Sequence, residues 1–397
     1  MLDAALQDTR DLVASAAALA PLLASRAQAA ERDRQVPAEN VALLRRAELL
    51  RILVPRRFGG LEQDLVTAGR VVEALGAGCG ATAWMFGVAT MHTMVVATFP
   101  FEAQEEIWAD APQALVSGSY APNPKAQTAQ RVEGGFRLSG RWGFASGCDH
   151  ADWHMVQFLL FSGPEAPPQP YFAIVPRAEF RIEDDWNVMG LSGTGSKTVV
   201  FDDVFVPSHR TLEYAKMNAG TTPGAAMHAN PVYGLPFMSF APLSISCPVV
   251  GMARGALASV LAGAAVGSHD SAVRGKFADH VMAHNWIGQA MAEIDAASLV
   301  IQGALERLEL IAGERREPTR DERVRVRRDY AFGIRLCVHA VQALLNCSGA
   351  SGITLDNPVQ RAWRDVNAAA RHLGLNWEPY AIQSGRNALG LDPKGLF

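Results

Sequence analysis

The sequence lacks a surplus of basic residues and any long apolar run. Its 40 Asp and Glu residues outnumber its 36 Lys and Arg residues, so the net charge is -4. A basic surface that neutralises phosphates supplies most non-specific affinity for nucleic acid, and we therefore expect no nucleic-acid partner. No stretch reaches the ~20 uninterrupted apolar residues that a membrane span needs, so we also expect no membrane association.

The five cysteines never form a C-x-x-C pair. Their odd number and scattered positions indicate neither a disulfide framework nor a zinc knuckle. An apolar stretch runs from Leu12 to Ala24, but acidic residues precede it where a secretory signal begins with a basic segment. We therefore expect a cytoplasmic protein.

Hydrophobic residues make up 49% of the 397 positions, which is enough for two or three compact domains. Apolar residues at helical spacing predict an N-terminal helical domain over 1–112 and a C-terminal helical bundle over 241–397. Between them, runs rich in Val, Phe and Trp alternate with Gly-Gly and Ser-Gly turns. This pattern predicts a central β-domain over 113–212, followed by a loop region over 213–240. The order indicates an α+β protein.

Two segments resemble anion sites and are better explained otherwise. The run GLSGTGSKT at 190–198 nearly matches a phosphate-binding P-loop, but an extra residue precedes Lys197 and a strand-like run follows where a P-loop leads into a helix. We therefore exclude an NTPase and keep a hydroxyl-rich loop that can approach a phosphate or a ring edge. In the charged segment 314–329, Thr319 and Glu322 form a capping-box pair, which predicts a helix start.

The histidines show no metal-binding pattern. His280 and His284 lie four residues apart on a predicted helix, but no Glu follows the first of them as in zinc-binding helices. We predict no metal site. His92 and His372 have aromatic neighbours, and the residues alone leave open whether each is a core side chain or a catalytic one.

Four segments together resemble the acyl-CoA dehydrogenase superfamily: VPRRFGG at 54–60, SGRWGFASG at 139–147, GLSGTGS at 190–196 and DDVFVP at 202–207. The resemblance covers nearly the whole chain. It implies an N-terminal helical domain, a central β-barrel domain and a C-terminal four-helix bundle, with a flavin held between barrel and bundle in a homotetramer.

Two branches of this superfamily differ in the residue that meets the substrate. Dehydrogenases remove the α-proton of an acyl-CoA with a Glu that lies shortly after an Arg-Asp pair or at the start of the first bundle helix. Here neither 366–373 nor 240–242 holds an acid. His372 stands close to the first place. In this the chain resembles two-component flavin-dependent monooxygenases similar to the oxygenase component of p-hydroxyphenylacetate hydroxylase.

This branch implies a reaction and a set of residues. Reduced flavin, FMN or FAD, comes from a separate flavin reductase and reacts with O2 to a C4a-hydroperoxide, which oxygenates an aromatic or other electron-rich small molecule. His372 would act on a phenol-like hydroxyl, His92 would bind the peroxide or the substrate, and Ser146 would hydrogen-bond near flavin N5. The implied cofactor-binding residues are Trp142, Phe144, Ser146, Gly147, Ser192, Gly193, Thr194, Ser196 and Arg274.

Five further side chains are candidates for the substrate pocket: Trp84, Met91, Tyr120, Phe237 and Trp377. As residue types they fit a core or an interface equally well. Two alternatives also stay open at this point. One is an acyl-CoA dehydrogenase with an unrecognised base, which desaturates an acyl thioester. The other is a protein of the same fold without enzymatic activity.

Overall fold

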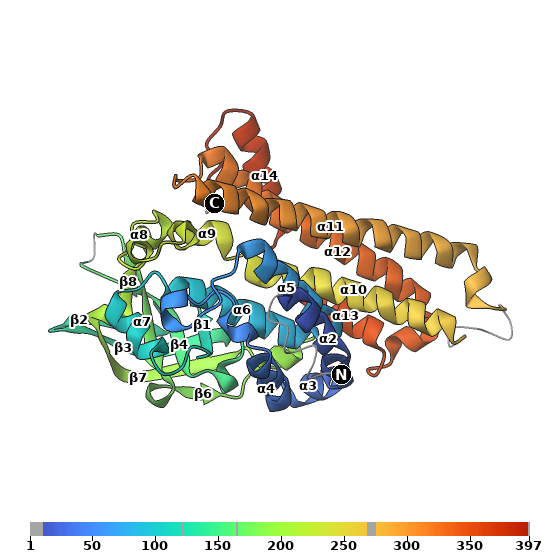
Figure 1. Ribbon diagram of the computed structural model, residues 1–397, viewed down its shortest axis with the longest axis horizontal. Coiled ribbons are helices and arrows are strands. Elements are labelled where there is room, and N and C mark those ends of the chain that lie inside the picture. Colours follow the sequence, from blue (N-terminus) through green and yellow to red (C-terminus); the bar gives the residue numbers. More distant parts are fainter. Residues whose placement is uncertain (1–10, 121, 164–165, 268–274, 396–397) are drawn as a thin grey trace.

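Helices and strands follow one another in three blocks along the chain (Figure 1). The computed structural model describes residues 11–120, 122–163, 166–267 and 275–395. The first block is helical, the second holds the strands, and the third is helical again. The predicted α+β class is therefore confirmed.

The N-terminal block packs around one helix that is apolar on every side. Its helices are α2 (Leu12–Ser25), α3 (Ala27–Asp33), α4 (Ala38–Arg46), α5 (Leu65–Gly78), α6 (Gly80–Val96) and α7 (Phe101–Trp108). Every residue of α6 after Gly80 is buried. Two other helices of the block begin at side-chain caps: the Asp11 carboxylate accepts from the backbone N–H of Ala14 at 2.9 Å at the start of α2, and Asp64 caps α5 in the same way. Helix α6 therefore carries its side chains into the middle of the molecule.

The strands form two sheets of four, and the expected barrel is not closed. They are β1 (Val116–Ser119), β2 (Gln127–Val132), β3 (Gly135–Ala145), β4 (Trp153–Leu160), β5 (Gln169–Pro176), β6 (Arg181–Glu183), β7 (Lys197–Pro207) and β8 (Thr211–Glu213). One sheet has the order β1-β4-β5-β8 and the other β2-β3-β7-β6. Three of the four edge strands have only three or four residues, so among the described strands they are too short to join the two sheets into one barrel. The inner faces pack on each other instead.

A bulge in β3 changes which way its side chains point. Trp142 pairs with Val199 but Ala145 pairs with Lys197, so one extra residue lies on the β3 side. Phe144 lies in this bulge and has a left-handed backbone conformation, φ 62°. In a regular strand Phe144 would share the buried face of Trp142. The bulge turns it outward instead, and 71% of it is exposed.

The C-terminal block is a bundle reached through a segment with two short helices. Its members are α8 (Tyr214–Asn218), α9 (Phe237–Phe240), α10 (Leu243–Ala265), α11 (Val281–Gly313), α12 (Arg320–Cys347), α13 (Pro358–Ala369) and α14 (Trp377–Ala388). Helix α10 packs against α5 and α6 and joins this block to the first. The predicted capping box is confirmed, because Thr319 and Glu322 bond each other's backbone at the start of α12.

One stretch, Phe237–Ala265, is long and apolar enough to pass a test for membrane-spanning helices. Of its most apolar window, 61% is buried inside the protein. Buried core helices of globular domains pass the same test, and the packing of α10 against α5, α6 and α12 places it in that class.

Candidate active site

Four side chains from three parts of the chain join in one buried row of hydrogen bonds. The indole Nε1 of Trp84, on α6, donates to Ser146 Oγ at 3.2 Å. Ser146 Oγ lies 2.7 Å from Ser196 Oγ, which lies 2.6 Å from Thr194 Oγ1. Thr194 Oγ1 in turn donates to the carbonyl oxygen of Leu191 at 2.8 Å. None of these side chains is more than 7% exposed, and we call the three hydroxyl side chains the hydroxyl row.

Backbone turns bring the hydroxyl row together. Gly147 has φ 72°, and its N–H donates to the carbonyl of Thr194 at 2.9 Å, which ties the end of β3 to the loop before β7. A hydrogen bond also ties this loop to the C-terminal bundle: the buried carboxylate of Asp365, on α13, accepts from the N–H of Leu191 at 2.6 Å. Burial raises the pKa of Asp365 to about 6. Nothing in the sequence marks this anchor, because Asp365 and Leu191 are distant along the chain.

An exposed apolar surface lies beside the hydroxyl row. Phe144 meets the ring of Trp186 edge-on, with 5.8 Å between centroids, and Met189 is 58% exposed in the following loop. A flat heteroaromatic ring has apolar faces and polar edges. An apolar wall that adjoins buried hydroxyl groups therefore has the chemistry to hold one.

His372 stands after α13, next to the same tryptophan. Its ring centroid lies 6.3 Å from that of Trp84. The residue is exposed to solvent, while the protein atoms packed around the ring, and then the charge of Arg327, lower its pKa to about 4. Its Nδ1 accepts from the N–H of Gly374 at 3.0 Å. The neutral ring therefore carries its hydrogen on Nε2 and is a donor there.

His92 has the opposite tautomer. It is 1% exposed on α6, and its Nδ1 lies 2.7 Å from the carbonyl oxygen of Val116, to which only an N–H can bond. Its Nε2 is therefore a hydrogen-bond acceptor. Burial lowers its pKa to about 4, so at pH 7 the ring is neutral. A Cβ at Gly118 would lie 2.9 Å from Nε2, so glycine is needed beside this ring.

Aromatic rings extend from His92 toward α9. Tyr120 meets His92 edge-on with 5.3 Å between centroids and Phe237 with 5.6 Å. Trp84 and Met91, also predicted for the substrate pocket, are each 6% exposed on α6. The structure therefore brings four of the five predicted pocket residues to α6 or to rings that adjoin it.

Other predicted residues lie elsewhere. Trp142 is fully buried between the sheets, where its Nε1 donates to the Gln157 carbonyl and its ring packs on Phe201. Trp377 packs on Phe332 of α12 and shows no ring contact with the residues above in the described part of the chain. Arg274 lies outside the described residues.

Two loop residues predicted for the cofactor have structural partners. The hydroxyl of Ser192 donates to the carbonyl of Val188 at 3.0 Å. Gly193 packs against α3 so closely that a Cβ would lie 3.0 Å from Ala30. Their contribution to a ligand site would therefore come from the backbone.

Sequence reasoning missed a buried cation near His372. Arg327, on α12, is 1% exposed, and among the described residues no carboxylate pairs with it. It donates to the Tyr380 hydroxyl and to the Met238 carbonyl, while its Nε has no partner. Tyr380 donates to the carbonyl of Leu373, next to His372. In the sequence Arg327 is one of several arginines in the charged segment 314–329, so nothing there marks it as the buried one.

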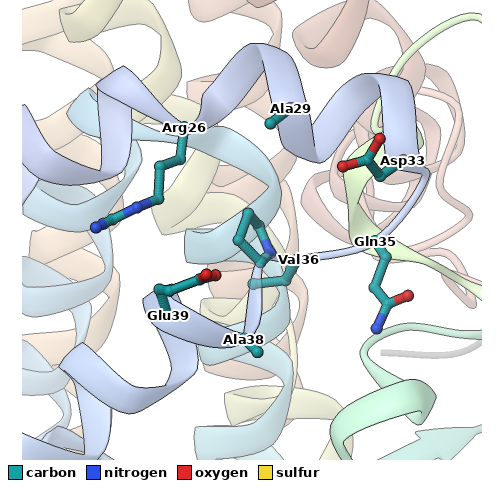
Figure 2. A pocket seen from close by; sticks show the side chains of 8 residues that line it. Arg26, Ala29, Asp33, Gln35, Val36, Ala38 and Glu39 are labelled. Carbon is teal, nitrogen blue, oxygen red and sulfur yellow. The ribbon is translucent and has the colours of Figure 1, made fainter.

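A separate pocket of about 400 Å³ lies between α3 and α4. Figure 2 shows that Arg26, Asp33 and Glu39 point toward it, so its walls carry both signs of charge. None of the predicted site residues lines it. In the described part of the chain no three His, Cys, Asp or Glu side chains gather as metal ligands.

Comparison with known proteins gives the family. The acyl-CoA dehydrogenase N-terminal domain matches residues 6–111, and the acyl-CoA dehydrogenase C-terminal domain matches residues 243–377. The chain belongs to the acyl-CoA dehydrogenase family. Within the family it is similar to the oxygenase component of the FADH(2)-dependent resorcinol hydroxylase of Rhizobium sp. (strain MTP-10005), at 37% identity over 97% of this chain and 96% of that protein.

Solved structures of the same family superpose over the full length. The 3-HSA hydroxylase from Rhodococcus sp. RHA1 gives a TM-score of 0.90 at 32% identity and covers 100% of this chain and 99% of its own. XiaF from Streptomyces sp., solved in complex with FADH2 and glycerol, gives 0.88 at 27% identity over 99% and 98% of the two chains. Among acyl-CoA dehydrogenase family members, the chain thus belongs to the oxygenase components of flavin-dependent monooxygenases.

The residues present fit this branch and not a dehydrogenase. A dehydrogenase needs a carboxylate base after the Arg-Asp pair or at the start of the first bundle helix. Asp365 is engaged with the Leu191 N–H, and Glu378 is exposed on the first turn of α14. The hydroxyl row and the apolar wall beside it have the donor set and the shape that a flavin ring requires.

Proposed function

We propose that this chain hydroxylates a phenol-like aromatic molecule with reduced flavin from a separate reductase and O2. The observation that carries the proposal is a pair of neutral imidazoles with opposite tautomers. His92 offers a lone pair at Nε2 beside Tyr120, and His372 offers an N–H at Nε2 beside Trp84, which lies about two turns before His92 on α6. No carboxylate replaces either of them in the described site.

The two histidines divide hydrogen bonding between them. His92 Nε2 can accept a hydrogen bond from the phenolic hydroxyl, which makes the ring more electron-rich. His372 Nε2–H can donate to another oxygen atom. This division assigns the contact with the phenolic hydroxyl to His92, where the sequence pattern alone assigned action on the phenol to His372. Both rings are neutral at pH 7 because their pKa values are lowered to about 4.

A reduced flavin bound beside the hydroxyl row would supply the electrons that activate O2. Ser146, Phe144 and the backbone of the 190–196 loop would hold it, and the buried side chains of α6 exclude water from its neighbourhood. The similarity to XiaF with FADH2 favours FAD, while FMN stays an alternative because Arg274 lies outside the described residues. We propose phenols first because the similar Rhizobium protein is a resorcinol hydroxylase.

Assembly and location are part of the same proposal. A homotetramer would cover the apolar side chains that α11 exposes, among them Leu299 and Leu310 at 71% and 69% exposure. Free cysteines that are all buried suit a reducing compartment such as the cytoplasm.

The proposal is tested by oxygen uptake with reduced flavin. Chemically reduced FAD or FMN is mixed with the protein, O2 and resorcinol, phenol or indole, and O2 uptake, hydroxylated product and hydrogen peroxide are all measured. We expect one hydroxylated product for each O2 that does not appear as hydrogen peroxide, and no product without protein. If no phenol or indole gives product while an acyl-CoA bleaches the oxidised flavin anaerobically, the dehydrogenase alternative replaces the proposal.

A further inference from the structure

The three hydroxyl groups of the hydroxyl row have one hydrogen each. The direction of one hydrogen bond in the row therefore fixes the direction of the others. Each hydroxyl has one hydrogen and two lone pairs. Thr194 gives its hydrogen to the Leu191 carbonyl at 2.8 Å. The contact of 2.6 Å between Thr194 and Ser196 then needs the hydrogen of Ser196, and the contact of 2.7 Å between Ser196 and Ser146 needs that of Ser146.

In this direction Ser146 has no hydrogen left to give. Its oxygen accepts from Trp84 Nε1 at 3.2 Å, so one lone pair remains. Ser146 can therefore accept a hydrogen bond from a ligand but cannot donate one.

The hydrogen bonds of the row can also run in the reverse direction. If Thr194 donates to Ser196 and Ser196 donates to Ser146, both lone pairs of Ser146 are used and its hydrogen is free for a ligand. The Leu191 carbonyl then loses the Thr194 hydroxyl, but it keeps two donors, the N–H of Thr194 at 3.1 Å and Nε1 of Trp186 at 3.2 Å. The only hydrogen without a partner in this direction is that of Ser146, so a ligand that accepts it favours the reverse state.

Flavin presents different partners in its two oxidation states. Its ring nitrogen N5 has a lone pair when the flavin is oxidised and carries a hydrogen when it is reduced. We propose that Ser196 and Thr194 form a hydrogen-bond relay that makes Ser146 an acceptor for reduced flavin and a donor for oxidised flavin. The inference rests on the proposed function, because it requires a flavin edge at Ser146. Ser196 and Thr194 are positioning residues here, acting through Ser146.

The relay predicts a change in selectivity between oxidation states. In Thr194→Val, Ser196 has only Ser146 to donate to, and Ser146 is held as a donor. Reduced flavin then meets a hydrogen where it needs a lone pair. We expect the ratio of Kd for reduced flavin to Kd for oxidised flavin to rise about tenfold, the effect of one hydrogen bond.

The experiment is an anaerobic titration of the whole protein with FMN and with FAD. Oxidised flavin is followed by its absorbance change, and dithionite-reduced flavin by ultrafiltration. Thr194→Ala also leaves Ser196 with only Ser146 to donate to, so it should shift the ratio in the same direction, and it serves if Thr194→Val does not fold. Thr194→Ser keeps the hydroxyl and should restore the wild-type ratio. Ser146→Ala should weaken the binding of flavin in both oxidation states and should change the ratio of the two Kd values less than Thr194→Val does.

Thr211→Val is a matched control. Thr211 is a buried threonine that donates to the carbonyl three residues earlier, Ser208, at 2.8 Å, as Thr194 does to Leu191. Thr211 lies on β8, outside the site. In Thr211→Val the ratio of Kd for reduced flavin to Kd for oxidised flavin should equal that of the wild type. If both oxidation states bind and neither Thr194→Val nor Thr194→Ala raises the ratio, the relay is overturned and the proposed function stands. If the folded wild type binds neither FMN nor FAD in either state, the proposed function fails and the relay with it.

Discussion

At the scale of single residues, burial decides which side chains carry charge at neutral pH. His92 and His154 are 1% and 0% exposed, and burial lowers their pKa values to about 4 and about 3. In His154 the Nδ1 bonds Ser117 at 2.7 Å while Nε2 has no partner. Both rings are uncharged in the folded protein, and this makes them sensitive to acid.

We expect the free energy of unfolding to fall as the pH is lowered from 6.5 toward 4. The unfolded histidines bind protons with pKa near 6.5, whereas the folded ones do not until about pH 4, so protons favour unfolding in this window. Each such histidine contributes a slope of about 1.4 kcal/mol per pH unit. His154→Gln should lower the slope by that amount in urea unfolding at pH 5 to 6. Asp365, with its raised pKa, has the opposite sign, but it cancels in the comparison of variant with wild type. Equal slopes would contradict the prediction.

Removal of the His372 imidazole should lower product formation by ~10²-fold or more, as expected when a general acid or hydrogen-bond donor is lost. The ring is accessible, and its backbone partner Gly374 is two residues away, so His372→Ala should fold like the wild type. His372→Gln keeps a neutral donor and should recover part of the yield. Product and hydrogen peroxide are measured together with reduced flavin. Unchanged product in His372→Ala would remove His372 from the mechanism.

At the scale of elements, one buried guanidinium holds three parts of the bundle in place. Arg327 of α12 bonds Tyr380 of α14 and the Met238 carbonyl of α9, and its guanidinium carbon lies 4.4 Å from the Tyr380 ring centroid. Through the Tyr380 hydroxyl, which donates at 3.1 Å to the Leu373 carbonyl, α14 also holds the turn that carries His372. Helix packing here fixes the turn that carries His372.

Tyr380→Phe should lower the free energy of unfolding by about 2 kcal/mol, because a buried donor and a buried acceptor lose their partner. It should also lower product formation, because the His372 turn loses its anchor. Thr319→Ala is the matched control: loss of the α12 cap costs about 1 kcal/mol but lies away from the site. Urea unfolding and product yield are compared for both. The prediction fails if Tyr380→Phe forms product as well as Thr319→Ala does.

At the scale of the whole molecule, α11 presents large apolar side chains outward. It lies along the outer edge of the bundle in Figure 1. Leu299 and Leu310 are eleven residues apart, which is three helical turns, so they share one face, with Gly303 and Glu306 between them. Because large apolar side chains are exposed on this face, we place the proposed subunit interface here.

The double variant Leu299→Glu, Leu310→Glu should form a smaller assembly than the wild type. Two carboxylates on an apolar interface would lose their hydration on association, which disfavours it. Light scattering coupled to size exclusion measures the mass of both proteins. Glu306→Gln, on the exposed side of the same helix, is the control for a change of charge alone. An identical mass for the double variant and the wild type would place the interface elsewhere.

The sequence by itself determined the parts that depend on local pattern. Apolar periodicity gave the α+β order, Thr319 and Glu322 gave a helix start, and the motifs at 139–147 and 190–196 led to the family. The closed barrel expected from resemblance is absent among the described strands, because the edge strands are too short. The local sequence pattern predicts which faces are buried and where helices begin, because both depend on residues that are close together along the chain.

Only the tertiary structure decided which residues meet. A bulge separates Phe144 from Trp142, which the strand pattern places on one face. The tautomers of His92 and His372 depend on the Val116 carbonyl and the Gly374 N–H. The hydroxyl row joins Ser146 to a loop fifty residues away. Such contacts depend on how distant segments pack, and no periodicity along the chain records that packing.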